Sequence, residues 1–126
     1  MIEGVGAAPS WLVEIEARIN SILALRSNWD TYNAAPVDVC HVASALDWLP
    51  RLTGPNTPMP AVVPTAARGV QFEWEVGGVA IELRTGDDGG HIFVADDLGE
   101  TEGPISGGLL ERAATALASG STRASS

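Results

Sequence analysis

The stretch that decides the fold is VQFEWEVGGVAIELR, residues 70–84. Apolar residues alternate with polar ones on both sides of Gly77-Gly78, and this pattern is typical of a β-hairpin with a two-residue turn. Because the turn fixes the register, the apolar side chains share one face of the hairpin and the polar side chains share the other. We therefore expect one face packed on a core and one face in contact with water.

The polar face of this hairpin is acidic. The register places Glu73 directly opposite Glu82, and like charges in that position are unfavourable. With Glu75 nearby, the arrangement favours binding of a basic partner or a cation. The alternative is that Arg84, diagonal to Glu82, and the solvent relieve the repulsion, because interactions between exposed charges are small. The same register pairs Gln71 with Arg84 and Glu75 with Ala80.

Two helices are predicted before the hairpin. Apolar residues recur at steps of three and four over residues 11–26, and Ser10 is the expected N-cap of that helix. A second helix is expected over residues 37–49, with Asp38 as its cap. Pro50 should end it, because a proline inside a helix loses a hydrogen bond and clashes with the preceding turn.

The rest of the chain predicts further strands and one more helix. The proline-rich residues 52–64 are an extended connector or an edge strand around Ala61-Val62-Val63. Residues 91–95 form another strand, in which either Ile92 and Val94 or Phe93 faces the core. Residues 96–103 are expected to be an acidic loop, with Pro104 in the first turn of a last helix.

This order of elements predicts an α+β fold: two N-terminal helices, an antiparallel meander of three to four strands, and a C-terminal helix. We expect a single domain over residues 9–118 and a disordered tail over residues 119–126, which are small and polar.

Composition narrows the classes of function. The 126 residues carry a formal net charge of −9, which repels phosphate backbones and anionic lipids, so direct binding of nucleic acid or membrane is not expected. We expect no signal peptide and no membrane-spanning segment. The one cysteine, Cys40, is compatible with a reducing cytoplasm, where we expect the protein to act.

The sequence offers weak candidates for chemistry. The pair Glu73 and Glu82 has a spacing that hydrolases use, but an open sheet face lacks the burial that raises a carboxyl pKa. The fragment DDGGH does not match a calcium loop, and Cys40, His41 and His91 lack zinc spacing. We therefore expect no catalytic residue, no metal and no cofactor. A hydrolase or metal enzyme that uses the acidic loops Asp87-Asp88 and Asp96-Asp97 is a further alternative.

The loop of residues 27–36 contains two large aromatic side chains, Trp29 and Tyr32. They are candidates for the margin of a recognition surface, because Trp and Tyr dominate binding hot spots. The competing interpretation is that Trp29 fills the junction between helix and sheet while Asp30 caps backbone amides.

Two motifs stand out on either side of the second predicted helix. The first is Asn28-Trp29-Asp30-x-Tyr32 with Pro36 after it. The second is PxPxVxPT at residues 58–65, followed by GVQFEW at residues 69–74. Together they resemble a group of small, uncharacterised bacterial proteins. The resemblance covers about residues 20–85 and implies no activity. The commoner form has an acidic residue and two glycines where Ala67, Arg68 and Gly69 stand here.

These observations predict a small acidic protein that binds another, basic protein, in an antitoxin-like or accessory role. The alternative is a structural subunit of a homomeric or phage-like assembly, in which Ala61-Val62-Val63 pairs with a neighbouring copy. Self-association is left open by the sequence. The expected partner-binding residues are Gln71, Glu73, Glu75, Glu82, Arg84, Trp29 and Tyr32.

Overall fold

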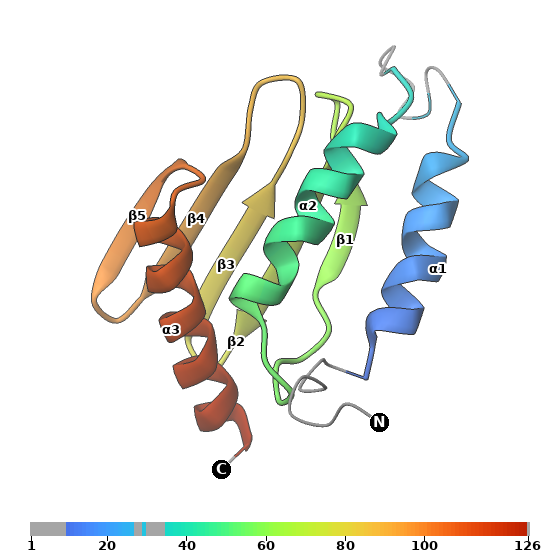
Figure 1. Ribbon diagram of the computed structural model, residues 1–126. Coiled ribbons are helices and arrows are strands. Elements are labelled where there is room, and N and C mark those ends of the chain that lie inside the picture. Colours follow the sequence, from blue (N-terminus) through green and yellow to red (C-terminus); the bar gives the residue numbers. More distant parts are fainter. Residues whose placement is uncertain (1–9, 27–28, 30–34, 126) are drawn as a thin grey trace.

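The computed structural model describes residues 10–26, 29 and 35–125, and this part of the chain folds into three helices and one five-stranded sheet (Figure 1). The sheet is antiparallel, and its strand order is the chain order. The α+β prediction is confirmed, with five strands in place of three to four. The elements are α1 (Leu12–Leu23), α2 (Val39–Leu52), β1 (Ala61–Pro64), β2 (Val70–Val76), β3 (Val79–Arg84), β4 (His91–Asp96), β5 (Gly99–Pro104) and α3 (Gly107–Ser125).

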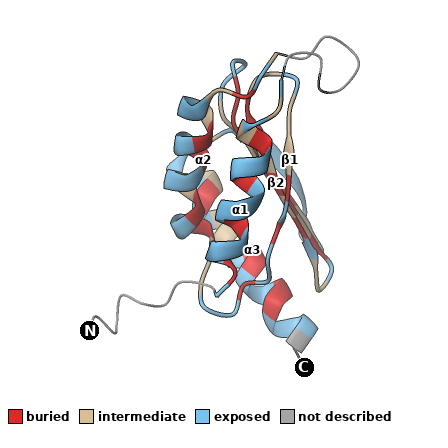
Figure 2. Ribbon diagram, turned by 90° about the vertical axis from the view of Figure 1, so that its right-hand side faces the viewer, coloured by how far each residue is buried: buried red, intermediate tan, exposed pale blue. Residues whose placement is uncertain are grey.

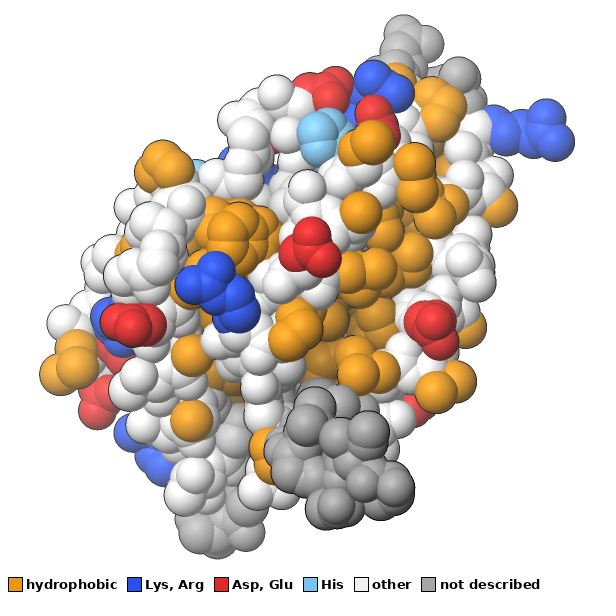
Figure 3. All heavy atoms as spheres, in the orientation of Figure 1, with side chains coloured by type: hydrophobic (Ala, Val, Ile, Leu, Met, Phe, Trp, Pro, Cys, Tyr) orange, Lys and Arg blue, Asp and Glu red, His pale blue; other side chains and the backbone are white. Residues whose placement is uncertain are grey.

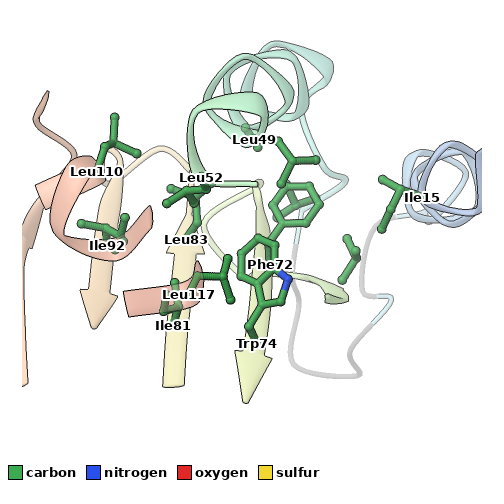
Figure 4. Close-up of a cluster of buried hydrophobic side chains, with 14 of the residues drawn as sticks. Ile15, Leu49, Leu52, Phe72, Trp74, Ile81, Leu83, Ile92, Leu110 and Leu117 are labelled. Carbon is green, nitrogen blue, oxygen red and sulfur yellow. The ribbon is translucent and has the colours of Figure 1, made fainter. Parts of the chain in front are cut away.

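The three helices cover one face of the sheet and leave the other face open (Figures 1 and 2). Helix α1 packs against β1, α2 against β2 and α3, and α3 against β2, β3 and β4. The core lies between the two layers, where side chains of the central strands meet those of the helices (Figure 4). Among them Phe72, Ile81, Leu83 and Leu117 are completely buried.

The hairpin of β2 and β3 has the predicted register. Phe72 pairs with Leu83, and Trp74 pairs with Ile81, all on the core face. Gly77 and Gly78 both have positive φ, at 57° and 81°. These values belong to the turn whose twist matches that of the two strands, and glycine adopts them without a steric penalty.

The structure resolves the register of β4 and corrects the segment after it. Ile92 and Val94 are buried on the core face, so Phe93 points to the open face. The acidic loop expected over residues 96–103 is wrong, because β5 pairs with β4 throughout its length. Pro104 is the last residue of β5 rather than part of a helix, and α3 begins at Gly107 after Ser106, whose hydroxyl accepts from Leu109 N–H.

The predicted ends of the first two helices needed correction. Helix α1 has Trp11 in place of Ser10 at its N-cap, without a side-chain capping bond, and it ends at Leu23. Asp38 caps α2 as predicted, by accepting from Cys40 N–H at 2.8 Å. Pro50 lies inside α2 instead of ending it. Only Arg51 and Leu52 follow this proline in the helix, and burial of Leu52 holds them against the core.

The expected disordered tail is wrong as far as residue 125, because α3 continues to Ser125. The contact that holds this end uses a glycine in place of an apolar side chain. A Cβ on Gly120 would lie 2.5 Å from the Val76 carbonyl oxygen, so helix and hairpin touch through their backbones. Arg123 Nε also donates to the Gly77 carbonyl at 2.9 Å.

The outside of the helical layer carries some apolar side chains. They are visible between α1 and α2 in Figure 3, and the partly exposed members of these two helices include Leu12, Val39 and Leu46. None of the helices in the described part of the chain is both long and apolar enough to cross a membrane.

Candidate partner-binding face

The open face of the sheet is built from alternate residues of all five strands. Across the middle of this face the registers align Ala61, Glu73, Glu82, Phe93 and Glu102 in one row. The helices hold the opposite face, so the pleat forces these side chains toward water. We call this surface the open sheet face. Its other members are Val63, Gln71, Arg84, His91 and Pro104 in one flanking row, and Glu75, Ala80, Ala95 and Glu100 in the other.

A hollow of about 280 Å³ lies on the open sheet face. Small side chains explain it, because Ala61 and Ala80 leave space between larger neighbours. The carboxylate-bearing residues Glu73, Glu75 and Glu82 line it, and the methyl groups of Ala61 and Ala80 form its floor. Trp74 and Ile81 also border the hollow, but their side chains project to the core face. The hollow therefore combines an apolar floor with an acidic rim, which suits the alkyl stem and cationic head of a lysine or arginine.

The two basic side chains of the open sheet face are engaged at one end of it. Arg84 NH2 lies 3.6 Å from an oxygen of Asp88, and Arg84 Nε is buried without a hydrogen-bond partner among the described residues. His91 Nε2 lies 3.1 Å from Glu102 Oε2. Gln71 Nε2 donates to Glu73 Oε2 and orients that carboxylate. No described basic group pairs with Glu75 or Glu82.

The structure brings five of the seven predicted binding residues together and places one elsewhere. Gln71, Glu73, Glu75, Glu82 and Arg84 share the open sheet face as predicted. Half-buried Trp29 does not line the hollow. Its Nε1 donates to the Ala35 carbonyl at 2.9 Å. The carbonyl of the next residue, Pro36, accepts from Arg68, which lies just before β2 and therefore at the opposite end of that strand from the Gly77-Gly78 turn. Tyr32 lies outside the described residues.

Strands β4 and β5 also contribute to this face, which was not predicted from the sequence. Phe93 is half-buried between Glu82 and Glu102, and Glu100 and Glu102 are exposed. The alternation of Glu100 and Glu102 with Thr101 and Gly103 was the available signal. It is weak because the residues between the glutamates are not apolar.

The edge formed by β1 is largely blocked against a further strand. Thr65 N–H donates to the Gly69 carbonyl at 3.0 Å, so in this ladder the odd-numbered residues bond β2, and Val62 and Pro64 point outward. Pro64 has no N–H, and Arg18 Nε already donates to the Val62 carbonyl at 3.0 Å. Both are devices that proteins use to protect an edge strand.

A second polar cluster joins the start of α2 to the loop between β3 and β4. His41 Nε2 lies 2.7 Å from Asp87 Oδ1, and Arg68 reaches both Asp38, at 3.5 Å, and Asp87, at 3.9 Å. The Cys40 N–H bond lowers the pKa of Asp38, with Arg68 and His41 assisting. These ion pairs connect the start of α2, the loop before β2 and the loop between β3 and β4. Ser44 and His41 line one surface pocket, separate from the hollow on the open sheet face, but the Ser44 hydroxyl donates to the Cys40 carbonyl and His41 pairs with Asp87.

The β4–β5 hairpin is attached to α3 by a two-bond ion pair. Arg112 donates to both oxygens of Asp96, at 2.7 and 2.9 Å. Only 7% of the Asp96 side chain is exposed, so solvent screens this pair weakly. The Arg112 guanidinium lowers the pKa of Asp96, and in return the pKa of Arg112 is raised. In the part of the chain that the structure describes, no three His, Cys, Asp or Glu side chains are grouped to hold a metal ion.

Comparison with known proteins adds no identity to this geometry, since no protein-family model, no curated protein and no solved structure matches the chain.

Proposed function

We propose that this protein is a binding module that takes a basic protein partner on its open sheet face. The observation that carries the proposal is the acidic hollow, in which Glu73, Glu75 and Glu82 surround an apolar floor on a face that no described helix covers. A Glu-Glu pair directly across two strands costs stability. A cation of the partner that binds beside the two carboxylates would neutralise their charge and remove this cost.

The role we propose is antitoxin-like or accessory, in which this chain neutralises or carries its partner in the cytoplasm. The net charge of −9 supports this role, because a strongly acidic surface speeds the encounter with a cationic protein, and added salt slows it. The structural-subunit alternative relied on pairing between copies at β1. That edge offers few free groups, because Pro64 and the Arg18–Val62 bond occupy it.

The test compares two variants that have lost the same amount of charge. One carries Glu73→Gln, Glu75→Gln and Glu82→Gln on the open sheet face. The other carries Glu14→Gln, Glu16→Gln and Asp47→Asn, which are exposed on the helical side. Each substitution set removes three negative charges. Tagged proteins are used to capture a partner at low salt, and the captured protein is then purified and titrated against each variant by calorimetry.

We expect the wild type and the helical-side variant to bind one basic partner in a fixed ratio, and the sheet-face variant to bind at least about tenfold more weakly, as losing contacts to desolvated charges implies. Equal weakening of both variants would mean that only net charge matters, and it would contradict a defined site. An antitoxin-like role further predicts that the partner expressed alone slows growth and that co-expression of this chain restores it.

A further inference from the structure

The two edges of the sheet differ in what they offer an incoming strand. At β1 the outward backbone groups belong to Val62 and Pro64 and are largely blocked. At β5 the outward groups belong to Glu100 and Glu102. Ile105 N–H donates to the Gly90 carbonyl at 3.3 Å and so continues a ladder in which Thr101 and Gly103 bond β4. The backbone groups of the residues between them therefore point away from β4.

The outward groups of β5 are available. The ladder phase leaves the N–H groups of Glu100 and Glu102 without a bond to β4, no turn, loop or cap bond in the described part of the chain uses them, and both residues are exposed. Helix α3 packs over β2, β3 and β4 and leaves the outer side of β5 uncovered (Figure 1). The two residues therefore present a pair of donors and a pair of acceptors spaced as an antiparallel strand requires.

We propose that an extended segment of the partner adds to β5 as a sixth strand and carries Lys or Arg at alternate positions; this inference rests on the proposed function and specifies the kind of partner. Residues directly opposite each other in an antiparallel pair share a face. The partner residues opposite Glu100 and Glu102 thus project onto the open sheet face, beside these two carboxylates. Cationic side chains at those two positions meet opposite charge, and main-chain bonds supply the rest of the affinity.

The same geometry selects against a second copy of this chain. Antiparallel pairing of two β5 strands would set carboxylates against carboxylates, which is unfavourable. The acidic edge therefore repels its own copies and attracts a cationic strand. Negative charge on an edge strand is also a known protection against unwanted pairing, so the selectivity for a basic segment follows from the same residues.

The experiment uses the full chain and two capped peptides of identical composition. In one, three lysines alternate with threonines, and in the other the three lysines are contiguous. Binding is followed by NMR titration, and amide hydrogen exchange is measured for Glu100 and Glu102. We expect the alternating peptide to bind about fivefold more tightly and to slow exchange of both amides. Equal affinity for the two peptides, or unchanged exchange, would overturn strand addition.

Two variants at one position separate the backbone from the charge. Glu102→Pro removes the outward N–H without touching the ladder to β4, and proline is tolerated at such edge positions. Glu102→Gln removes the charge and keeps the N–H. We expect affinity for the alternating peptide to fall about tenfold in Glu102→Pro at any salt concentration. In Glu102→Gln it should fall about twofold, and only at low salt. Circular dichroism checks that both variants fold.

The outcomes distinguish this inference from the proposed function. If Glu102→Pro binds as well as Glu102→Gln, strand addition is wrong. If in that case the triple variant Glu73→Gln, Glu75→Gln, Glu82→Gln still loses the peptide, the partner lies on the open sheet face and the proposed function stands. If the peptide is held by none of these residues, both proposals fail.

Discussion

The β2–β3 and β4–β5 hairpins have turns of the same length, but they are stabilised in different ways. In β2–β3 the strands carry their own apolar face, and Phe72, Trp74, Ile81 and Leu83 are all buried. In β4–β5 only β4 contributes apolar side chains, and β5 is exposed at nearly every residue. The first hairpin is thus held by side-chain burial. The second depends on its backbone ladder and on the ion pair between Asp96 and Arg112. The difference teaches that a strand can be specified by its neighbours instead of by its own pattern.

The largest difference should come from truncating one side chain in each hairpin. Phe72 is fully buried, so Phe72→Ala should lower the free energy of unfolding by about 3–5 kcal/mol. Thr101→Ala, in the exposed strand β5, should cost less than about 1 kcal/mol. Urea unfolding at neutral pH measures both. Similar losses would show that β5 is packed more tightly than its exposure indicates.

The two turn glycines of the first hairpin should differ from each other. Both have positive φ, so Gly78→Ala should cost about 1 kcal/mol for backbone strain alone. A Cβ on Gly77 would also lie 2.1 Å from the Gly120 carbonyl oxygen in α3. Gly77→Ala should therefore cost about 1–3 kcal/mol more, as overpacking does. Thermal unfolding compares the two variants, and equal costs would rule out close contact between α3 and this turn.

The ion pair between Asp96 and Arg112 should affect the stability of the fold at acid pH. Because Arg112 lowers the pKa of Asp96 below its ordinary value of 3.8, this carboxylate stabilises the fold fully above that value. The contribution is lost as the pH falls through the lower, folded-state pKa. Asp96→Asn should therefore reduce stability at pH 7 and flatten the loss of stability below about pH 4.

Asp97→Asn is the matched control for the acid-range measurement. Asp97 is the next residue along the chain, its side chain is 78% exposed, and its nearest ion-pair distance, to Arg123, is 3.9 Å. Stability measured from pH 2 to 8 should be nearly the same for Asp97→Asn and the wild type. If the two variants behave alike, the Asp96–Arg112 pair does not anchor the hairpin.

The smallest effect concerns the carboxylates of the open sheet face. Glu82→Gln removes the repulsion with Glu73 and should raise stability by about 0.2–0.5 kcal/mol at low salt. High salt should abolish the gain, because it screens exposed charges. Glu100→Gln is the control, since Ala95 lies opposite it. Loss of stability in Glu82→Gln would mean that Glu82 already has a favourable partner.

The contrast between the hairpins also explains what could be predicted from the sequence. Alternation around Gly77-Gly78 predicted the register of β2–β3 and, with it, the side chains that these two strands contribute to the open sheet face. Strand β5 was missed because Gly99–Pro104 contains no apolar residue to create a period of two. The end of α3 was missed because its contact with the hairpin is made by Gly120, which has no side chain to signal burial. Neither the hollow over Ala61 and Ala80 nor the free edge at Glu102 could be found without the strand order.

The guanidinium of Arg18 on the Val62 carbonyl has a consequence for polymerisation. A sheet that accepts a neighbour on both sides can grow without limit into a fibre, whereas one with a single receptive margin stops after one addition. By terminating growth at β1, this bond and Pro64 would restrict strand addition to one-to-one stoichiometry even at high concentration. Replacing Arg18 would then matter more for colloidal behaviour than for folding.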